Sequence, residues 1–187
     1  MNIKKFISFF LLLITLVFAT LAFYGCTASI SIPKDSAASP EKIYQFIRKQ
    51  EIFTDAPLIL YTITYRKEEN SFLFEGMDFF FQNKGEEQCT QVTFHNDSRV
   101  LTVKDIIGLD DILASVPFSV PDSGQMKDDI KNEVGEDIGY RYLKLSHYIY
   151  AHSQWEFWDY TLYSDTLDDK KTNYEFSIWA NEPATAS

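Results

Sequence analysis

Hydrophobic and polar positions alternate with a period of two over much of this chain, which is typical of β-strands. Six such runs are rich in β-branched and aromatic residues, and turn-forming residues separate them. The predicted strands are 58–66, 71–82, 87–95, 140–151, 155–164 and 173–180. The run SRVLTV at 98–103 is a candidate for one more short strand. Because the first three runs follow one another through short polar turns, they predict an antiparallel meander.

Helical signals lie between these runs. The segment Ser39–Glu41 supplies an N-cap, a proline at the first helical position and an acidic first turn, which predicts a helix over 40–53. Thr102 and Asp105 have the spacing of a capping box, and apolar residues continue at helical spacing as far as Val116. The middle of the chain is therefore predicted to be helical.

A third, short helix is predicted to begin after Ser123 and to end at Gly135. Six or seven strands with about three helices predict an α+β fold built on an antiparallel sheet. We expect one domain over 40–182, followed by a disordered tail over 183–187.

The first 26 residues follow a different pattern. The chain begins with the basic segment MNIKK, continues with 19 uncharged residues over 6–24, and closes this region with Gly25-Cys26. A basic start, an apolar stretch and small residues are what the secretion machinery recognises. Residues 1–25 are therefore predicted to be a signal peptide or a membrane anchor.

The Gly25-Cys26 junction resembles that of bacterial lipoprotein precursors, in which a Leu-(small)-(Gly/Ala/Ser)-Cys box is cleaved before the cysteine. Phe23 and Tyr24 depart from this pattern, where the family prefers leucine and a smaller residue. The resemblance covers the N-terminus alone. It implies that the Cys26 thiol carries a lipid, palmitate included, which anchors the protein in the cell membrane or the outer membrane.

Two alternatives to lipidation stay open. An uncleaved helix over 6–25 would be about 30 Å long, which is enough to span a bilayer. Ordinary cleavage near Ala22 or Ala28 would release the chain. Each reading places the domain outside the cytoplasm. In the anchored readings, which place it in the cell envelope, the polar segment 26–39 is a flexible tether.

Charge and cysteine content narrow the possible partners. The chain has 17 basic and 27 acidic residues, and this net charge of −10 argues against nucleic acid and anionic lipid surfaces as partners. Cys26 and Cys89 are its two cysteines. If Cys26 is lipidated, Cys89 has no disulfide partner, and its place in an alternating strand predicts a small buried residue.

Motifs of enzyme chemistry are missing from the sequence. It has no Gly-rich phosphate loop, no G-x-S-x-G, no H-E-x-x-H and no paired C-x-x-C, which disfavours phosphate transfer, nucleophile-elbow hydrolysis and structural zinc. His147 and His152 differ in strand parity, so a shared metal is not expected and both are interpreted as polar strand-end residues. No metal and no cofactor is predicted.

The segment 140–163 has nine aromatic residues on both faces of two predicted strands. One core layer cannot hold all of them, so at least one face is expected to remain partly open. Rings with a polar tip suit a ligand or partner surface, for which the candidates are Tyr140, Tyr142, Tyr148, Tyr150, Trp155 and Trp158.

The favoured function is a non-catalytic domain that presents this surface to an envelope protein or a small ligand. The alternative is a cell-envelope glycan hydrolase, with carboxylates such as Glu75, Asp78 or Asp159 beside the stacking residues Trp155 and Trp158. Glu75 and Asp78 have an odd spacing, which places them on opposite faces of a strand unless a bulge forms at the intervening glycine.

Overall fold

A computed structural model describes residues 27–37, 39–69, 71–83, 88–107, 113–135, 139–164 and 172–181. The predicted signal or anchor, the proposed lipidation site Cys26 and the C-terminal tail lie outside these ranges. No helix among the described residues has the length and apolar character needed to cross a membrane.

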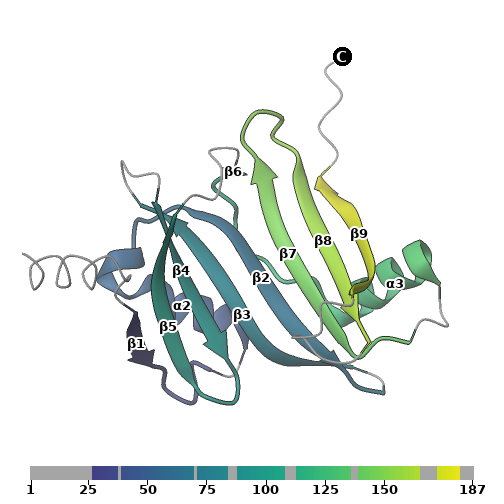
Figure 1. The fold of residues 1–187 in the computed structure, drawn as a ribbon, viewed down its shortest axis with the longest axis horizontal. Coiled ribbons are helices and arrows are strands. Elements are labelled where there is room, and N and C mark those ends of the chain that lie inside the picture. The colour runs from purple at the N-terminus through teal and green to yellow at the C-terminus, as the bar shows by residue number, and fades with distance from the viewer. Residues whose placement is uncertain are drawn as a thin grey trace, which may run out of the picture.

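One antiparallel sheet dominates the described part of the chain (Figure 1). Its nine strands are β1 (Ala28–Ser31), β2 (Leu58–Lys67), β3 (Phe72–Gln82), β4 (Gln88–His95), β5 (Val100–Ile107), β6 (Leu113–Ala114), β7 (Tyr142–Tyr150), β8 (Glu156–Tyr163) and β9 (Thr172–Asn181). Their order in the sheet is β1-β5-β4-β3-β2-β7-β8-β9, and β6 pairs with β7 off this path. The sheet curves visibly from one edge to the other.

Two α-helices pack on one face of the sheet, which we call the core face. The helix α2 (Pro40–Arg48) buries Ile43 and Ile47 there, and α3 (Ser123–Val134) buries Met126 and Ile130. The Ser39 hydroxyl caps α2 by accepting the Lys42 N–H, as its sequence pattern predicts. A short 3₁₀ turn over Glu51–Phe53 follows α2.

No described helix covers the opposite face, which we call the open face. Small polar side chains lie side by side along its middle, and one such row crosses five strands: Asp78, Thr62, Ser146, Asp159 and Ser177. The alternation of each strand therefore separates an apolar core face from a largely polar open face, as expected for an antiparallel sheet with one covered side.

A β-bulge sets the side-chain directions along β3. The β2–β3 pairing shifts by one residue after Thr64 and Gly76, which leaves Glu75 as the extra residue. Glycine is required here, because a Cβ on Gly76 would lie 2.6 Å from the backbone oxygen of Phe94. The shift brings Phe74 to the core side, where it stacks on Phe94.

The prediction of an α+β fold with about three helices is wrong. The described chain is mainly β, with nine strands and two α-helices. The error comes chiefly from the middle of the chain, where Thr102 and Asp105 resemble a capping box but lie within β5. There Asp105 accepts a hydrogen bond from Thr90 of the neighbouring β4, so cross-strand pairing outweighs the local helix signal.

The start of the domain also differs from expectation. Within the segment predicted to be a tether, β1 pairs with β5, and the side chains of Ile32 and Ala37 are buried in the core. The folded part of the described chain therefore begins before position 40. Cys89 is buried on β4, as predicted from its alternating pattern.

Candidate functional site

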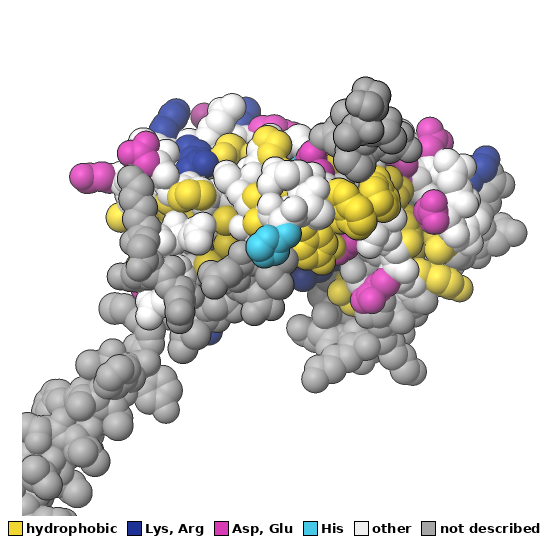
Figure 2. Space-filling model, turned by 90° about the horizontal axis from the view of Figure 1, so that it is seen from above, with side chains coloured by type: hydrophobic (Ala, Val, Ile, Leu, Met, Phe, Trp, Pro, Cys, Tyr) yellow, Lys and Arg dark blue, Asp and Glu magenta, His cyan; other side chains and the backbone are white. Residues whose placement is uncertain are grey.

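Five aromatic side chains gather on the open face where β7 ends, β8 begins and β9 ends. We call them the aromatic patch: Tyr148, Tyr150, Trp155, Phe157 and Trp179. Three are exposed to a degree unusual for such large rings, with relative accessibilities of 37% for Tyr150, 40% for Trp155 and 47% for Trp179. Viewed from above, hydrophobic side chains gather on this end of the molecule (Figure 2).

Phe157 is the centre of the aromatic patch, because its ring contacts all four of the others. Its ring centroid lies 5.4 Å from that of Trp179, 5.8 Å from Tyr150, 5.9 Å from Tyr148 and 6.2 Å from Trp155. The two indoles are 4.9 Å apart and tilted by 40°. Such offset and edge-to-face contacts are favourable arrangements for aromatic rings, so the patch is ordered by its own packing.

Strand register brings these residues together from distant parts of the sequence. Tyr148 on β7 pairs with Phe157 on β8, which pairs with Trp179 on β9. The turn between β7 and β8 places Tyr150 opposite Trp155, since the Tyr150 N–H donates to the Trp155 carbonyl at 3.0 Å. The row of paired residues that contains Tyr148 continues through Leu60 on β2 to Phe80 on β3. An apolar strip therefore crosses the open face.

A carboxylate lies beside the patch in the neighbouring polar row. Asp159 accepts a hydrogen bond of 2.5 Å from the Ser177 hydroxyl. Burial, and after it the hydrogen bond with Asp159, raises the pKa of Tyr148 far above its usual value. Tyr148 is therefore a neutral hydrogen-bonding group at the border between aromatic and polar rows.

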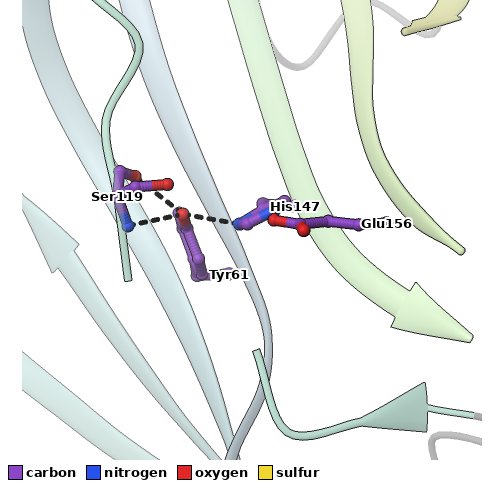
Figure 3. A network of polar contacts seen from close by, with 4 residues as sticks. All are labelled: Tyr61, Ser119, His147 and Glu156. Carbon is purple, nitrogen blue, oxygen red and sulfur yellow. Dashed lines mark hydrogen bonds and ion pairs between the residues drawn. The ribbon is translucent and has the colours of Figure 1, made fainter. Parts of the chain in front are cut away.

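A second group of functional side chains lies on the core face of the same strands (Figure 3). The Tyr61 hydroxyl donates to the Ser119 carbonyl at 2.7 Å and accepts the Ser119 N–H at 3.0 Å. His147 lies between Tyr61 and Glu156, with Nδ1 2.8 Å from the tyrosine oxygen and Nε2 2.7 Å from Glu156 Oε1. The chain of contacts joins β2, β7, β8 and the loop after β6.

Burial determines the protonation states of the hydrogen-bonded side chains Tyr61 and His147. It raises the pKa of Tyr61 to about 12 and lowers the pKa of His147, against the smaller opposing effect of the Glu156 hydrogen bond. A neutral His147 donates Nε2–H to the Glu156 carboxylate, and its Nδ1 shares the single proton of the Tyr61 hydroxyl with the Ser119 carbonyl as alternative acceptors. The His147 side chain has no exposed surface, so no substrate can reach its ring, and we assign this group a structural role.

The sequence misplaced two members of this buried region. His147 is a fully buried residue within β7, and the prediction of a polar strand-end position is wrong for it. Trp158, a candidate for the ligand surface, is 7% exposed and stacks on His147 with centroids 4.2 Å apart. Strand parity could have predicted the burial of His147, because this residue lies on the same face of its strand as Leu143 and Leu145.

The other sequence candidates fall into two sets. Tyr148, Tyr150 and Trp155 lie together in the aromatic patch. Tyr140 and Tyr142 lie away from it, each half-buried with a cation near its ring: Lys67 Nζ is 4.2 Å from the Tyr140 centroid, and Arg141 is 5.6 Å from that of Tyr142.

Phe157 and Trp179 belong to the patch but were not among the sequence candidates. Phe157 shares the strand parity of Trp155 and was therefore within reach of the sequence. Trp179 comes from β9, and its place follows only once the β8–β9 register is known.

The carboxylates considered for glycan hydrolysis are spread over the open face. Because of the bulge, Glu75 and Asp78 line one shallow hollow of about 140 Å³. Asp78 accepts hydrogen bonds from Thr62, Gln91 and Thr93, and Glu75 lies 3.3 Å from Arg66. Asp159 is three strands from Asp78 in the same row, roughly 14 Å at normal strand spacing.

Comparison with known proteins adds no relative. No protein-family model, curated protein or solved structure matches this chain. Within the described ranges, no group of three or more His, Cys, Asp or Glu side chains is placed to hold a metal ion. The two faces of the sheet are therefore the basis for assigning a function.

Proposed function

We propose that this protein is a membrane-tethered protein of the cell envelope whose domain binds a partner protein, without catalysis, through the aromatic patch. The observation that carries the proposal is the set of exposed rings at Tyr150, Trp155 and Trp179, beside a row of polar side chains on the same sheet face. A contiguous exposed apolar patch with a polar surround is a common mark of an interaction site.

The shape and composition of the patch favour a protein partner. Three hollows on the described surface are lined by residues outside the patch. Small ligands prefer concave sites, whereas the centre of a protein interface is often a flatter cluster of Trp and Tyr. Truncation of such central rings commonly costs 2 kcal/mol or more of binding free energy, on the order of a thirtyfold loss of affinity.

Glycan hydrolysis has weaker support from the same face. Asp159 is separated from Asp78 by more than the roughly 5–10 Å that paired glycosidase carboxylates need. Glu75 shares a hollow with Asp78, but its carboxylate is in an ion pair with Arg66. Asp78 also accepts three side-chain hydrogen bonds, which is typical of a structural carboxylate. His147, the one described histidine in a chain of hydrogen-bonded side chains, is closed to substrate.

Tethering is proposed from the N-terminal sequence. A basic start, 19 uncharged residues and the Gly25-Cys26 junction support lipidation at Cys26, or an uncleaved helix in its place. Either anchor would hold the domain at a membrane surface. A tethered domain meets a partner in the same membrane at a high effective concentration, so a patch of modest affinity is sufficient.

Site-specific photo-crosslinking in intact cells tests both parts of the proposal. A photoreactive amino acid replaces Trp155 or Trp179 in the full chain, and Tyr174 serves as the matched control. Tyr174 is also exposed and lies on β9, but it has the opposite parity to Trp179. We expect one protein adduct of defined mass from both patch positions, recovered in the membrane fraction, and none from Tyr174.

Equal labelling from Tyr174 and from the patch, or no adduct at the patch, contradicts the binding proposal. Cys26→Ala in the same cells should change the processing of the chain. A wild-type N-terminus that begins at Met1 would replace the lipid by an uncleaved helix as the anchor, and a chain found free of membranes would contradict tethering altogether.

A further inference from the structure

The strand β9 forms one edge of the sheet, next to the aromatic patch (Figure 1). It has ten residues, and Glu175 is its one charged residue. The opposite edge is β1, which has four residues. A short edge strand offers few backbone groups for pairing with another chain, so the longer β9 is the better edge for an added strand.

The direction of the β9 backbone follows from the hydrogen bonds of the neighbouring hairpin. The Tyr150 N–H donates to the Trp155 carbonyl, and the Tyr163 carbonyl accepts the Arg141 N–H. Odd-numbered residues of β8 therefore direct their backbone groups toward β7. In an antiparallel ladder the even-numbered residues then bond the other neighbour, which is β9.

Between the two register shifts of this pairing, the β9 residues paired with Leu162, Tyr160 and Trp158 of β8 are Tyr174, Phe176 and Ile178. Their backbone groups point to β8, so those of Glu175, Ser177 and Trp179 point out of the sheet. No hydrogen bond from the rest of the described chain reaches these outward groups. The same three residues carry exposed side chains on the open face, since Trp179 belongs to the patch and Ser177 to the polar row.

We propose that the outer edge of β9, at Glu175, Ser177 and Trp179, binds an extended segment of the partner protein as an added antiparallel strand. This inference rests on the proposed function and specifies its binding mode. An extended backbone is the ligand whose alternating N–H and C=O groups match those of a sheet edge. The added strand would continue the apolar strip, which already crosses five strands and ends at Trp179.

The side chains of β9 specify the partner segment further. An apolar residue of the segment would lie opposite Trp179, a small polar one opposite Ser177 and a basic one opposite Glu175, with a spacing of two between them. The net charge of −10 also favours a basic segment over an acidic one.

A second copy of this chain fits the edge less well. An antiparallel copy centred on Ser177 would place each Trp179 opposite the other copy's Glu175, an indole against a carboxylate. Two chains of net charge −10 would also repel one another. The edge and its side chains therefore match a basic and aromatic segment better than they match themselves.

A synthetic peptide provides the test, with the full-length protein in detergent. The probe is acetyl-Thr-Phe-Val-Thr-Val-Lys-Thr amide, which in antiparallel register places Phe, Thr and Lys opposite Trp179, Ser177 and Glu175. We expect binding, with slower amide hydrogen exchange at Ser177 and Trp179. N-methylation of the central Thr should weaken binding at least tenfold, because that N–H faces β9, whereas N-methylation of a Val should change it less than threefold.

Two protein variants complete the test. Ser177→Pro removes one outward N–H at a position where an edge strand tolerates proline, and should weaken peptide binding at least tenfold. Ser177→Ala keeps the N–H, removes the hydroxyl that bonds Asp159, and should change affinity less than threefold. If Ser177→Pro fails to fold, the two methylated peptides on the wild-type protein still give the answer.

Several results would overturn strand addition: no peptide binding, equal binding of the two methylated peptides, or full binding by a folded Ser177→Pro. A dimer whose Ser177 and Trp179 amides are protected before peptide is added would make a second copy the occupant instead. If cellular crosslinking from Trp155 persists in Ser177→Pro, the proposed function stands and strand addition alone fails.

Discussion

The hairpin of β7 and β8 carries aromatic clusters of opposite character on its two faces. On the core face His147 stacks on Trp158, and hydrogen bonds link the imidazole to Tyr61 and Glu156. On the open face Phe157 is surrounded by rings that remain exposed. Neighbouring residues therefore differ in accessibility: His147 and Trp158 are buried, whereas Tyr148 and Phe157 are partly exposed.

This contrast separates stability from recognition. On the core face every described buried side-chain N or O atom has a hydrogen-bond partner, so little remains there to bind another molecule. On the open face the rings keep much of their surface in water, which is unfavourable for a chain that acts alone. Exposed aromatic surface is retained where a partner covers it, and this is the physical basis of the binding proposal.

The largest expected effect compares two tryptophans of the same hairpin. Trp158→Ala should lower the free energy of unfolding by about 3–5 kcal/mol, because it leaves a cavity in the core beside His147. Trp155→Ala should lower it by about 1 kcal/mol or less, since 40% of that side chain is already exposed. Urea denaturation of both variants measures the difference.

Similar losses for the two variants would mean that the patch stabilises the fold as the core does. The patch would then be a second core layer, and the binding proposal would lose its main observation. The far-ultraviolet circular dichroism of Trp158→Ala serves as the control that the sheet has formed.

A smaller loss of stability is expected when Tyr61, which links His147 to the loop after β6, loses its hydroxyl. Tyr61→Phe removes the hydroxyl that bonds both Ser119 and His147, and should cost about 1–3 kcal/mol because buried polar groups lose their partner. Tyr174→Phe, at an exposed position, is the matched control and should stay within about 0.5 kcal/mol of wild type. Thermal unfolding distinguishes the two, and equal losses would contradict a special role for the Tyr61 hydroxyl.

The sequence predicted the strands better than it predicted the fold class. Period-two alternation located β2, β3, β4, β7, β8 and β9 to within about two residues, because each has one covered face. The candidate strand at 98–103 matches the start of β5, but the helix predicted from Thr102 and Asp105 is wrong, because pairing with β4 overrides that local helix rule. β1 lies in a polar segment whose strand character depends on pairing with β5.

The candidate site was only partly within reach of the sequence. Parity places Tyr148 and Tyr150 on one face of their strand, and the register of the hairpin adds Trp155 to that face. Parity alone does not say which face the helices cover, so the buried Trp158 was chosen with them. The arrival of Trp179 depends on long-range register, which no local pattern encodes.

The smallest expected effect is a pH dependence that belongs to the core face alone. Burial lowers the pKa of His147 below the value of about 6.5 that an unfolded histidine has. Between these two values the unfolded chain binds a proton that the folded chain does not, so acid favours unfolding. The stabilisation is therefore fully present above pH ~6.5 and is lost as the pH falls through the folded value. Urea denaturation from pH 8 to pH 5 should show it.

Two histidine variants isolate this contribution from that of the many carboxylates. His147→Gln should reduce the fall in stability on acidification, because it removes the titrating ring while its amide can still donate to Glu156. His152→Gln, at an exposed position in the β7–β8 turn, should leave the wild-type profile unchanged. A wild-type protein that gains stability relative to His147→Gln as the pH falls would show that the Glu156 carboxylate, and not burial, sets the charge of the ring.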